Sequence, residues 1–336
     1  MSNVLIIEEQ GSFFAGGTVI TADGQYTTEK PGNHGGQSFH GDHMYVSYQK
    51  PVHAKQLPIV FLHGAGQSGK TWESTPDGRE GYGTLFLRKG YSTYIVDQPR
   101  RGRAGNSTVS ETIDVQPNDQ FWYENFRMGI YPNLHETGQF PKDNYSLDQF
   151  LRQITPNTGA YDLDVISDGL AAVFEKIGDG ILVTHSQGGG PGWQAVLKSP
   201  HVKAVASYEP GTEFVFPKDE MPTHVATPFN DEAHIYLSQP IELEEFKKLT
   251  KTPIVIYYGD YISEENKHWS SQRWIERIHV AQAFAECVNK HGGDAKVVVL
   301  PEAGIYGNSH FAFAEKNNVE LADMLAAWMD EKGLSK

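Results

Sequence analysis

The chain has 336 residues, 39% of them hydrophobic, and a formal net charge of -14 at pH 7. This length fits one large α/β domain with insertions or two smaller domains, and we predict a single domain over residues 1–336. The acidic balance excludes general nucleic-acid binding, which needs clustered Lys and Arg to neutralise phosphates. The one basic cluster, Arg100, Arg101 and Arg103, is predicted to anchor a loop.

Cysteine content and hydropathy further limit the kinds of protein that this chain can be. Cys287 is the only cysteine, so intramolecular disulfides and cysteine-based zinc sites are excluded, and its apolar neighbours predict a buried side chain. The N-terminus lacks a basic start followed by a long apolar core, and no run of 18 apolar residues occurs. We therefore predict a soluble cytoplasmic protein with no membrane partner, or a periplasmic or secreted one if a leader has been removed.

The first 50 residues alternate apolar and polar positions around glycines, which predicts antiparallel strands at residues 17–20 and 44–48. Beyond residue 58, short apolar runs predict a parallel sheet that is covered on both faces. These runs are residues 59–62, 93–96, 181–184, 202–206, 253–258 and 295–300.

Segments with helical spacing lie between several of these runs, at residues 163–177, 274–288 and 319–329. Alternating strands and helices predict an α/β fold with a mostly parallel, doubly wound sheet. Residues 103–160 and 211–249 do not fit the alternation. We predict that they are cap insertions over an active site, the alternative being surface excursions that do not contact substrate.

The decapeptide ILVTHSQGGG, residues 181–190, places a serine between an apolar run and a glycine cluster. A strand can turn sharply into a helix there, which exposes the serine hydroxyl and lets the next N–H help to hold an oxyanion. Ser186 is therefore the candidate nucleophile. Thr184 replaces the first glycine of the usual G-x-S-x-G pattern, whereas Gly188 and Gly189 keep the small residues that the turn needs.

A serine needs a base to take its proton, and the base needs a carboxylate to orient it. His310 follows the last predicted strand in the loop PEAGIYGNSH, where a hydrolase of this chain order has its histidine. Two acids are candidates. Glu209 ends the strand after the nucleophile strand, and Asp260 ends the following one, so either carboxylate could in principle reach His310.

An oxyanion hole needs a second N–H, normally from the loop after the third strand. Residues 61–66, FLHGAG, supply a strand followed by such a loop. We predict that the backbone N–H groups of Ala65 and Gln187 form the oxyanion hole.

Residues 64–71, GAGQSGKT, also match the phosphate-loop formula, and the strand that ends in Asp97 resembles a magnesium-binding strand. A phosphate loop must open a helix whose N-terminal amides hold the phosphates. The next twelve residues, WESTPDGREGYG, contain a proline and three glycines that cannot sustain that helix. Nucleotide binding is therefore kept only as the alternative. The histidines His34, His40 and His43 match no metal-ligand spacing and are assigned no function.

With these features in place, the chain resembles the α/β-hydrolase fold and, more narrowly, the bacterial esterase 713-like group. The resemblance is carried by residues 63–103, by THSQGG at 184–189 and by SYEPG at 207–211. It implies that the acid is Glu209, with Asp260 in reserve, and it accounts for the missing first glycine. The group carries a cysteine pair where this chain has Ala65 and Gly66, so the oxyanion loop must be held by other contacts.

The sequence thus predicts a serine hydrolase that cleaves a carboxylic ester or a lactone through an acyl-enzyme. Ser186, His310 and Glu209 would form the triad, with no cofactor and no metal. The expected partner is a small-molecule ester, and the expected assembly is a monomer or a homodimer. A hydrolase fold used as a receptor, or for other chemistry such as a lyase reaction, is a further alternative.

Overall fold

The structure is a computed structural model that describes residues 4–223 and 237–336. Its central sheet has the strand order β1-β2-β4-β3-β7-β8-β11-β12. β1 and β2 pair with each other, and β2 with β4, in antiparallel fashion, whereas all neighbours from β4 to β12 are parallel. The strands are β1 (Ile7–Thr21), β2 (Ser38–Pro51), β3 (Ile59–Leu62), β4 (Thr93–Asp97), β7 (Gly180–His185), β8 (Val202–Tyr208), β11 (Ile254–Tyr258) and β12 (Ala295–Val299).

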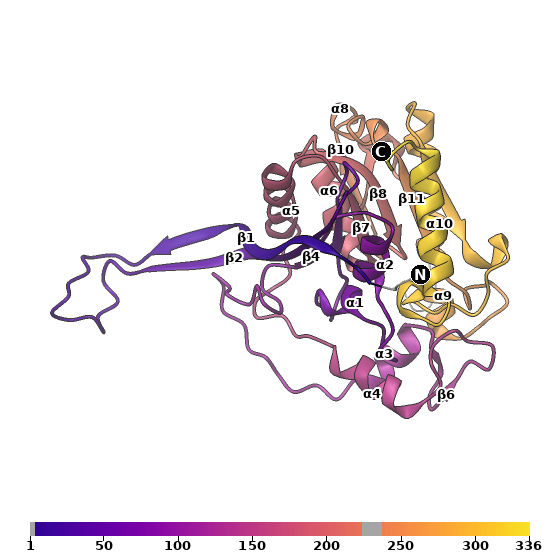
Figure 1. The fold of residues 1–336 in the computed structure, drawn as a ribbon, viewed down its shortest axis with the longest axis horizontal. Coiled ribbons are helices and arrows are strands. Elements are labelled where there is room, and N and C mark those ends of the chain that lie inside the picture. The colour runs from indigo at the N-terminus through magenta and orange to yellow at the C-terminus, as the bar shows by residue number, and fades with distance from the viewer. Residues whose placement is uncertain (1–3, 224–236) are drawn as a thin grey trace.

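The predicted α/β architecture is confirmed, and the apolar runs give the parallel strands. Every residue of β3, β4, β7 and β11 is buried, as expected for strands covered on both faces. β7 and β8 extend one or two residues beyond their apolar runs, because their polar last residues still pair in the sheet. β1 and β2 form a long ribbon whose outer part extends beyond the body of the protein (Figure 1).

Helices cover both faces of the sheet and divide the core into two clusters. One cluster packs α5 (Leu163–Ile177), α6 (Gly189–Lys198) and α9 (Trp269–Lys290) onto the sheet through residues such as Leu170, Trp193 and Phe284. The other packs α2 (Tyr82–Arg88) and α10 (Asn318–Glu331) onto the opposite face. The predicted helix at residues 163–177 is observed with the same bounds.

The first predicted insertion, residues 103–160, contains short elements that are not part of the central sheet. They are α3 (Asp119–Asn125), β5 (Gly129–Ile130), β6 (Asn133–Leu134) and α4 (Asn144–Arg152). In Figure 1 α3, α4 and β6 lie together at the lower edge of the molecule.

The second predicted insertion, residues 211–249, falls partly outside the described residues, at positions 224–236. Its described part contains β9 (Phe214–Pro217), β10 (Ser238–Ile241) and α8 (Leu243–Phe246), with β9 and β10 paired in parallel. Among the helices of the described chain, none is both long and apolar enough to cross a bilayer.

Candidate active site

Ser186 stands at an abrupt turn between β7 and α6. Its φ is +53°, a left-handed conformation that is strained for a residue with a side chain. The turn brings Gly64 so close that a Cβ on that glycine would lie 2.7 Å from Ser186 Cβ. A Cβ on Gly189 would lie 2.6 Å from Pro210 Cβ. The predicted glycine requirement around the serine therefore has a steric cause.

Thr184 takes the place of the first glycine of the G-x-S-x-G pattern, and the structure contains the space that its side chain needs. Its side chain is fully buried and its hydroxyl shares a 2.7 Å hydrogen bond with Ser207 on β8. A Cβ on Gly192 in α6 would lie 2.9 Å from Thr184 Cγ2. The absence of a side chain at Gly192 therefore lets the helix pass over the threonine.

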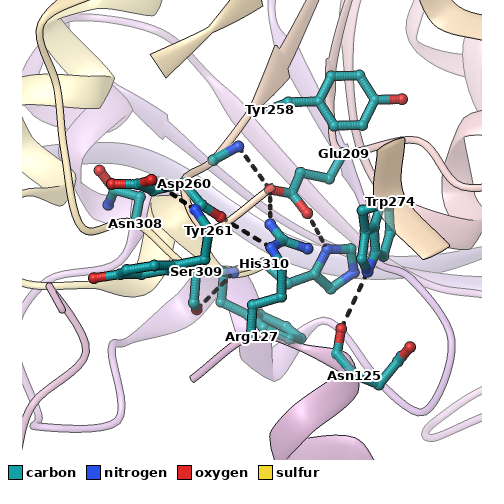
Figure 2. Close-up of polar contacts among 12 residues, drawn as sticks. Asn125, Arg127, Glu209, Tyr258, Asp260, Tyr261, Trp274, Asn308, Ser309 and His310 are labelled. Atoms are coloured by element: carbon teal, nitrogen blue, oxygen red, sulfur yellow. Dashed lines mark hydrogen bonds and ion pairs between the residues drawn. The ribbon is translucent and has the colours of Figure 1, made fainter. Parts of the chain in front are cut away.

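Glu209 and His310 are brought together by a hydrogen bond. His310 Nδ1 donates to Glu209 Oε2 over 2.5 Å, and both residues are about 1% exposed. Glu209 has a φ of +47° just beyond β8, and Gly259 N–H donates to its Oε1 over 2.7 Å. Figure 2 shows the carboxylate between the His310 ring and the Arg127 guanidinium.

Arg127 is the counter-ion of Glu209, and no sequence pattern pointed to it. Its Nη2 donates to Glu209 Oε1 over 2.5 Å, and its Nε donates to the Asp260 carbonyl over 3.0 Å. The side chain is 1% exposed, and its guanidinium lies 5.2 Å from the Trp274 ring centroid. Burial raises the pKa of Glu209, but Arg127 and His310 outweigh it, so the pKa lies below its usual value.

The His310 ring is enclosed by aromatic side chains. Phe126 stacks on it at a centroid distance of 5.2 Å and Trp274 lies at 4.4 Å. Burial lowers the pKa of His310, and Glu209 only partly offsets this, so the imidazole is neutral at pH 7 and can accept a proton. Its Nε2 is buried and has no hydrogen-bond partner within the described ranges.

Ser186 and His310 are linked through the residue that precedes the serine. His185 Nε2 donates to the His310 carbonyl over 3.0 Å, and the two imidazole centroids lie 4.5 Å apart. No hydrogen bond joins Ser186 Oγ to His310 Nε2 in the described chain. Catalytic hydrogen bonds are often long before substrate binds, so the unpartnered Nε2 remains suited to the serine proton.

Asp260, the reserve acid, contacts a different part of the histidine loop. Its carboxylate accepts hydrogen bonds from Gly307 N–H over 2.8 Å and from Tyr261 N–H over 2.6 Å. Figure 2 shows it beside Asn308 and Ser309, whereas Glu209 bonds the His310 ring. Asp260 is therefore placed to shape the loop.

The loop that carries Ala65 is held by several hydrogen bonds in place of a cysteine pair. The Gly64 carbonyl accepts from Arg101 Nη1 over 2.7 Å and from His63 Nδ1 over 3.0 Å. Thr155 N–H donates to the Gly66 carbonyl over 2.9 Å. Ala65 and Gln187 both line one pocket of about 420 Å³, and their role as oxyanion donors stays a prediction.

The phosphate-loop alternative finds little support in the geometry. α1 (Lys70–Glu73) has four residues, and Lys70 Nζ donates to the carbonyl and hydroxyl oxygens of Ser74. Asp97 accepts hydrogen bonds from Gly69 N–H over 2.6 Å and from Arg103 Nε over 2.8 Å. Lys70 and Asp97, which would bind a nucleotide and its magnesium ion, thus form hydrogen bonds with other residues of the protein.

The family model described as alpha/beta hydrolase family matches residues 59–324. The chain belongs to this family. A solved structure described as a novel bacterial esterase is 30% identical, covers 98% of both chains and has a TM-score of 0.78. The chain is also 26% identical over 332 residues to the probable secreted lipase phiG of a fungal species, with 86% of each chain covered. The predicted fold and the resemblance to a bacterial esterase are confirmed.

One group of side chains in the described residues has the geometry to hold a metal ion. The ligand atoms of Glu220, Cys287 and His291 lie within 4.8 Å of one another, although Lys290 also bonds the glutamate. Cys287 is buried, as predicted. Its thiol donates to Glu220 Oε2 from 67 residues away, and no sequence pattern predicts this contact. None of the proposed triad residues belongs to this group, and the absence of a metal from the reaction stays a prediction.

A buried acid supports the loop that carries His310. Glu315 is fully buried, and its carboxylate accepts hydrogen bonds from Ser309 N–H at 3.0 and 3.1 Å and from Asn308 Nδ2 at 2.8 Å. Burial raises the pKa of Glu315 to about 7, against the lowering effect of these donors. Sequence reasoning missed this residue because it follows the histidine without any motif.

The free energy of unfolding is expected to fall as pH rises from about 4.5 to about 7, because unfolded Glu315 ionises before the folded residue does. The folded state then binds more protons than the unfolded state. Glu315→Gln should remove this contribution, worth at most about 3 kcal/mol, from the difference between pH 5 and pH 8. Urea unfolding of both proteins at the two pH values measures it. An unchanged pH difference in the variant would count against a proton held by Glu315.

Proposed function

We propose that the chain is a serine hydrolase that cleaves carboxylic esters or lactones through a Ser186–His310–Glu209 triad. The observation that carries the proposal is the 2.5 Å hydrogen bond between His310 Nδ1 and Glu209. On the other side of the ring, the buried Nε2 has no hydrogen-bond partner among the described residues. This is the arrangement that a serine requires of its base and its orienting acid. The strained turn at Ser186 supplies the nucleophile.

In the proposed reaction, Ser186 Oγ attacks the ester carbonyl carbon while His310 Nε2 takes the hydroxyl proton. Glu209 stabilises the imidazolium that forms, and the N–H groups of Ala65 and Gln187 bind the oxyanion. Collapse of the tetrahedral intermediate passes the proton from His310 to the departing alcohol. Water then attacks the acyl-enzyme with His310 again as base, which releases the acid and restores Ser186.

Two observations favour Glu209 over Asp260 as the acid of the triad. Only Glu209, of these two, bonds the His310 ring. Arg127 and Gly259 hold the glutamate ionised and fixed in place, whereas Asp260 bonds backbone N–H groups of neighbouring loops. The relatives named esterase and lipase support ester hydrolysis as the general activity.

A fluorophosphonate probe tests this assignment directly. We expect one covalent adduct per chain by intact mass, mapped to Ser186 by peptide sequencing, and hydrolysis of short p-nitrophenyl esters that the adduct abolishes. Ser186→Ala should remove both labelling and hydrolysis. Ser309→Ala, a change at a serine of the histidine loop, should keep the label at Ser186.

The alternatives predict different outcomes in this experiment and in a nucleotide-binding measurement. A receptor or a lyase with this fold would show no ester hydrolysis, and an adduct on another serine would reject Ser186 as nucleophile. A nucleotide-binding protein would lose ATP or GTP binding in Lys70→Ala and would be indifferent to Ser186→Ala.

A further inference from the structure

Three arginines lie close together after β4, and within residues 4–223 and 237–336 the middle one forms no ion pair. Arg100 pairs with Asp42 over 2.8 Å, and Arg103 pairs with Asp97 over 2.8 Å. Arg101 is 3% exposed, and it forms no ion pair within 4.0 Å among the described residues, although Asp97 acts on it at longer range. Burying a charge without a counter-ion costs several kcal/mol, so such a charge is normally retained for a purpose.

The guanidinium of Arg101 is held rigidly by neutral acceptors. Its Nη1 donates to the Gly64 carbonyl, its Nε donates to Asn157 Oδ1 over 2.6 Å, and its Nη2 lies 3.5 Å from Gln187 Oε1. Burial lowers the pKa of Arg101 to about 10, so the side chain is still charged at neutral pH. Five N–H donors in a fixed fork leave donor capacity beyond these contacts.

Arg101 also lines the pocket of about 420 Å³ beside the predicted oxyanion donors Ala65 and Gln187. The same pocket has apolar walls from Trp122 and Ile154. Its one acidic lining residue, Asp114, is exposed and forms no ion pair with Arg101. A buried positive charge that lines a partly apolar pocket suits a ligand with a short carbon chain and a terminal anion.

We propose that this pocket binds a carboxylate group of the ester substrate, with Arg101 as its counter-ion. The inference rests on the proposed ester hydrolysis and specifies the substrate class as an ester with a free carboxylate a few carbons from the scissile carbonyl. The carboxylate lies in the acyl part or in the alcohol part, and matched substrates separate the two cases.

The test compares each carboxylate ester with its neutral methyl ester. p-Nitrophenyl glutarate and its methyl ester place the carboxylate in the acyl part; 4-acetoxybenzoate and its methyl ester place it in the leaving group. In the wild-type protein one of the two carboxylate substrates should have the higher kcat/KM within its pair. Arg101→Gln should lower the ratio of carboxylate to methyl ester roughly 10- to 100-fold, mainly through KM, because a charged hydrogen bond is lost.

Three further variants test whether Arg101 has only a structural effect on the Gly64 loop. Arg101→Lys keeps the charge and should recover part of the ratio. Asn157→Asp places a carboxylate against Arg101 without removing the guanidinium, and should lower the ratio roughly 5- to 10-fold. Arg152→Gln removes an exposed surface charge and should leave the ratio unchanged.

The outcomes separate this inference from the proposed function. Equal losses on carboxylate and methyl esters in Arg101→Gln would mean that the arginine only supports the oxyanion loop, and would overturn the inference. Hydrolysis of methyl esters without any preference for a carboxylate would do the same while leaving the esterase proposal intact. Hydrolysis of none of the four substrates would contradict the proposed function itself.

Discussion

Glu209→Gln is expected to lower kcat for ester hydrolysis by roughly 10⁴-fold while the protein remains folded. The amide cannot stabilise the imidazolium that forms when His310 takes the serine proton. It also presents a neutral group to His310 Nδ1, which removes the preference for the tautomer with Nε2 free. Steady-state kinetics on a p-nitrophenyl ester, with circular dichroism to verify folding, measures the effect.

Asp260→Asn is the matched control, because it is the same chemical change one strand away. Asp260 bonds the N–H groups of Gly307 and Tyr261, and an asparagine oxygen can still accept one of these bonds. We expect kcat within about 10-fold of the wild-type value. A larger loss in Asp260→Asn than in Glu209→Gln would assign the triad acid to Asp260 instead.

Arg127→Met is expected to reduce the free energy of unfolding by about 3–5 kcal/mol, because it leaves the Glu209 carboxylate buried without its counter-ion. Methionine preserves much of the side-chain length, so the loss reports chiefly on charge. The pKa of Glu209 should rise in the variant, since Arg127 is the main influence that lowers it. Urea unfolding at pH 7 gives the free energy.

A double variant distinguishes this ion-pair effect from a packing defect. In Arg127→Met/Glu209→Gln no buried charge is left unpaired, so part of the stability lost in Arg127→Met should return. Arg152→Met, at an exposed ion pair, should change stability by less than about 1 kcal/mol. Strictly additive losses in the double variant would show that Arg127 and Glu209 are not coupled.

The sheet could be predicted from the sequence because parallel strands covered on both faces are short, continuous apolar runs. β3 has the bounds that this pattern predicts, and α5 has the bounds that helical spacing predicts. The turn around Ser186 is also local, since the strand, the serine and the glycines follow one another in the chain. The placement of His310 after the last strand follows from chain order alone.

The surroundings of the site could not be predicted in the same way. Arg127 comes from an insertion without periodicity, and its side chain reaches Glu209 from 82 residues away with a backbone φ of +56°. The choice between Glu209 and Asp260 depends on side-chain geometry at the ends of two adjacent strands, which no local pattern encodes. Arg101 belongs to a cluster of three arginines, and the sequence does not show that its two neighbours are the ones that form ion pairs.

The origin of Arg127 limits how this protein can diverge. Loops above an α/β sheet are usually the variable part, exchanged freely while the scaffold persists. Here Phe126 stacks on the His310 imidazole, and Arg127 pairs with Glu209 beside that imidazole. The loop therefore supplies the counter-ion of an acid that the scaffold carries. A descendant that replaced this loop to accept a new substrate would have to supply another cation for Glu209 in the same step.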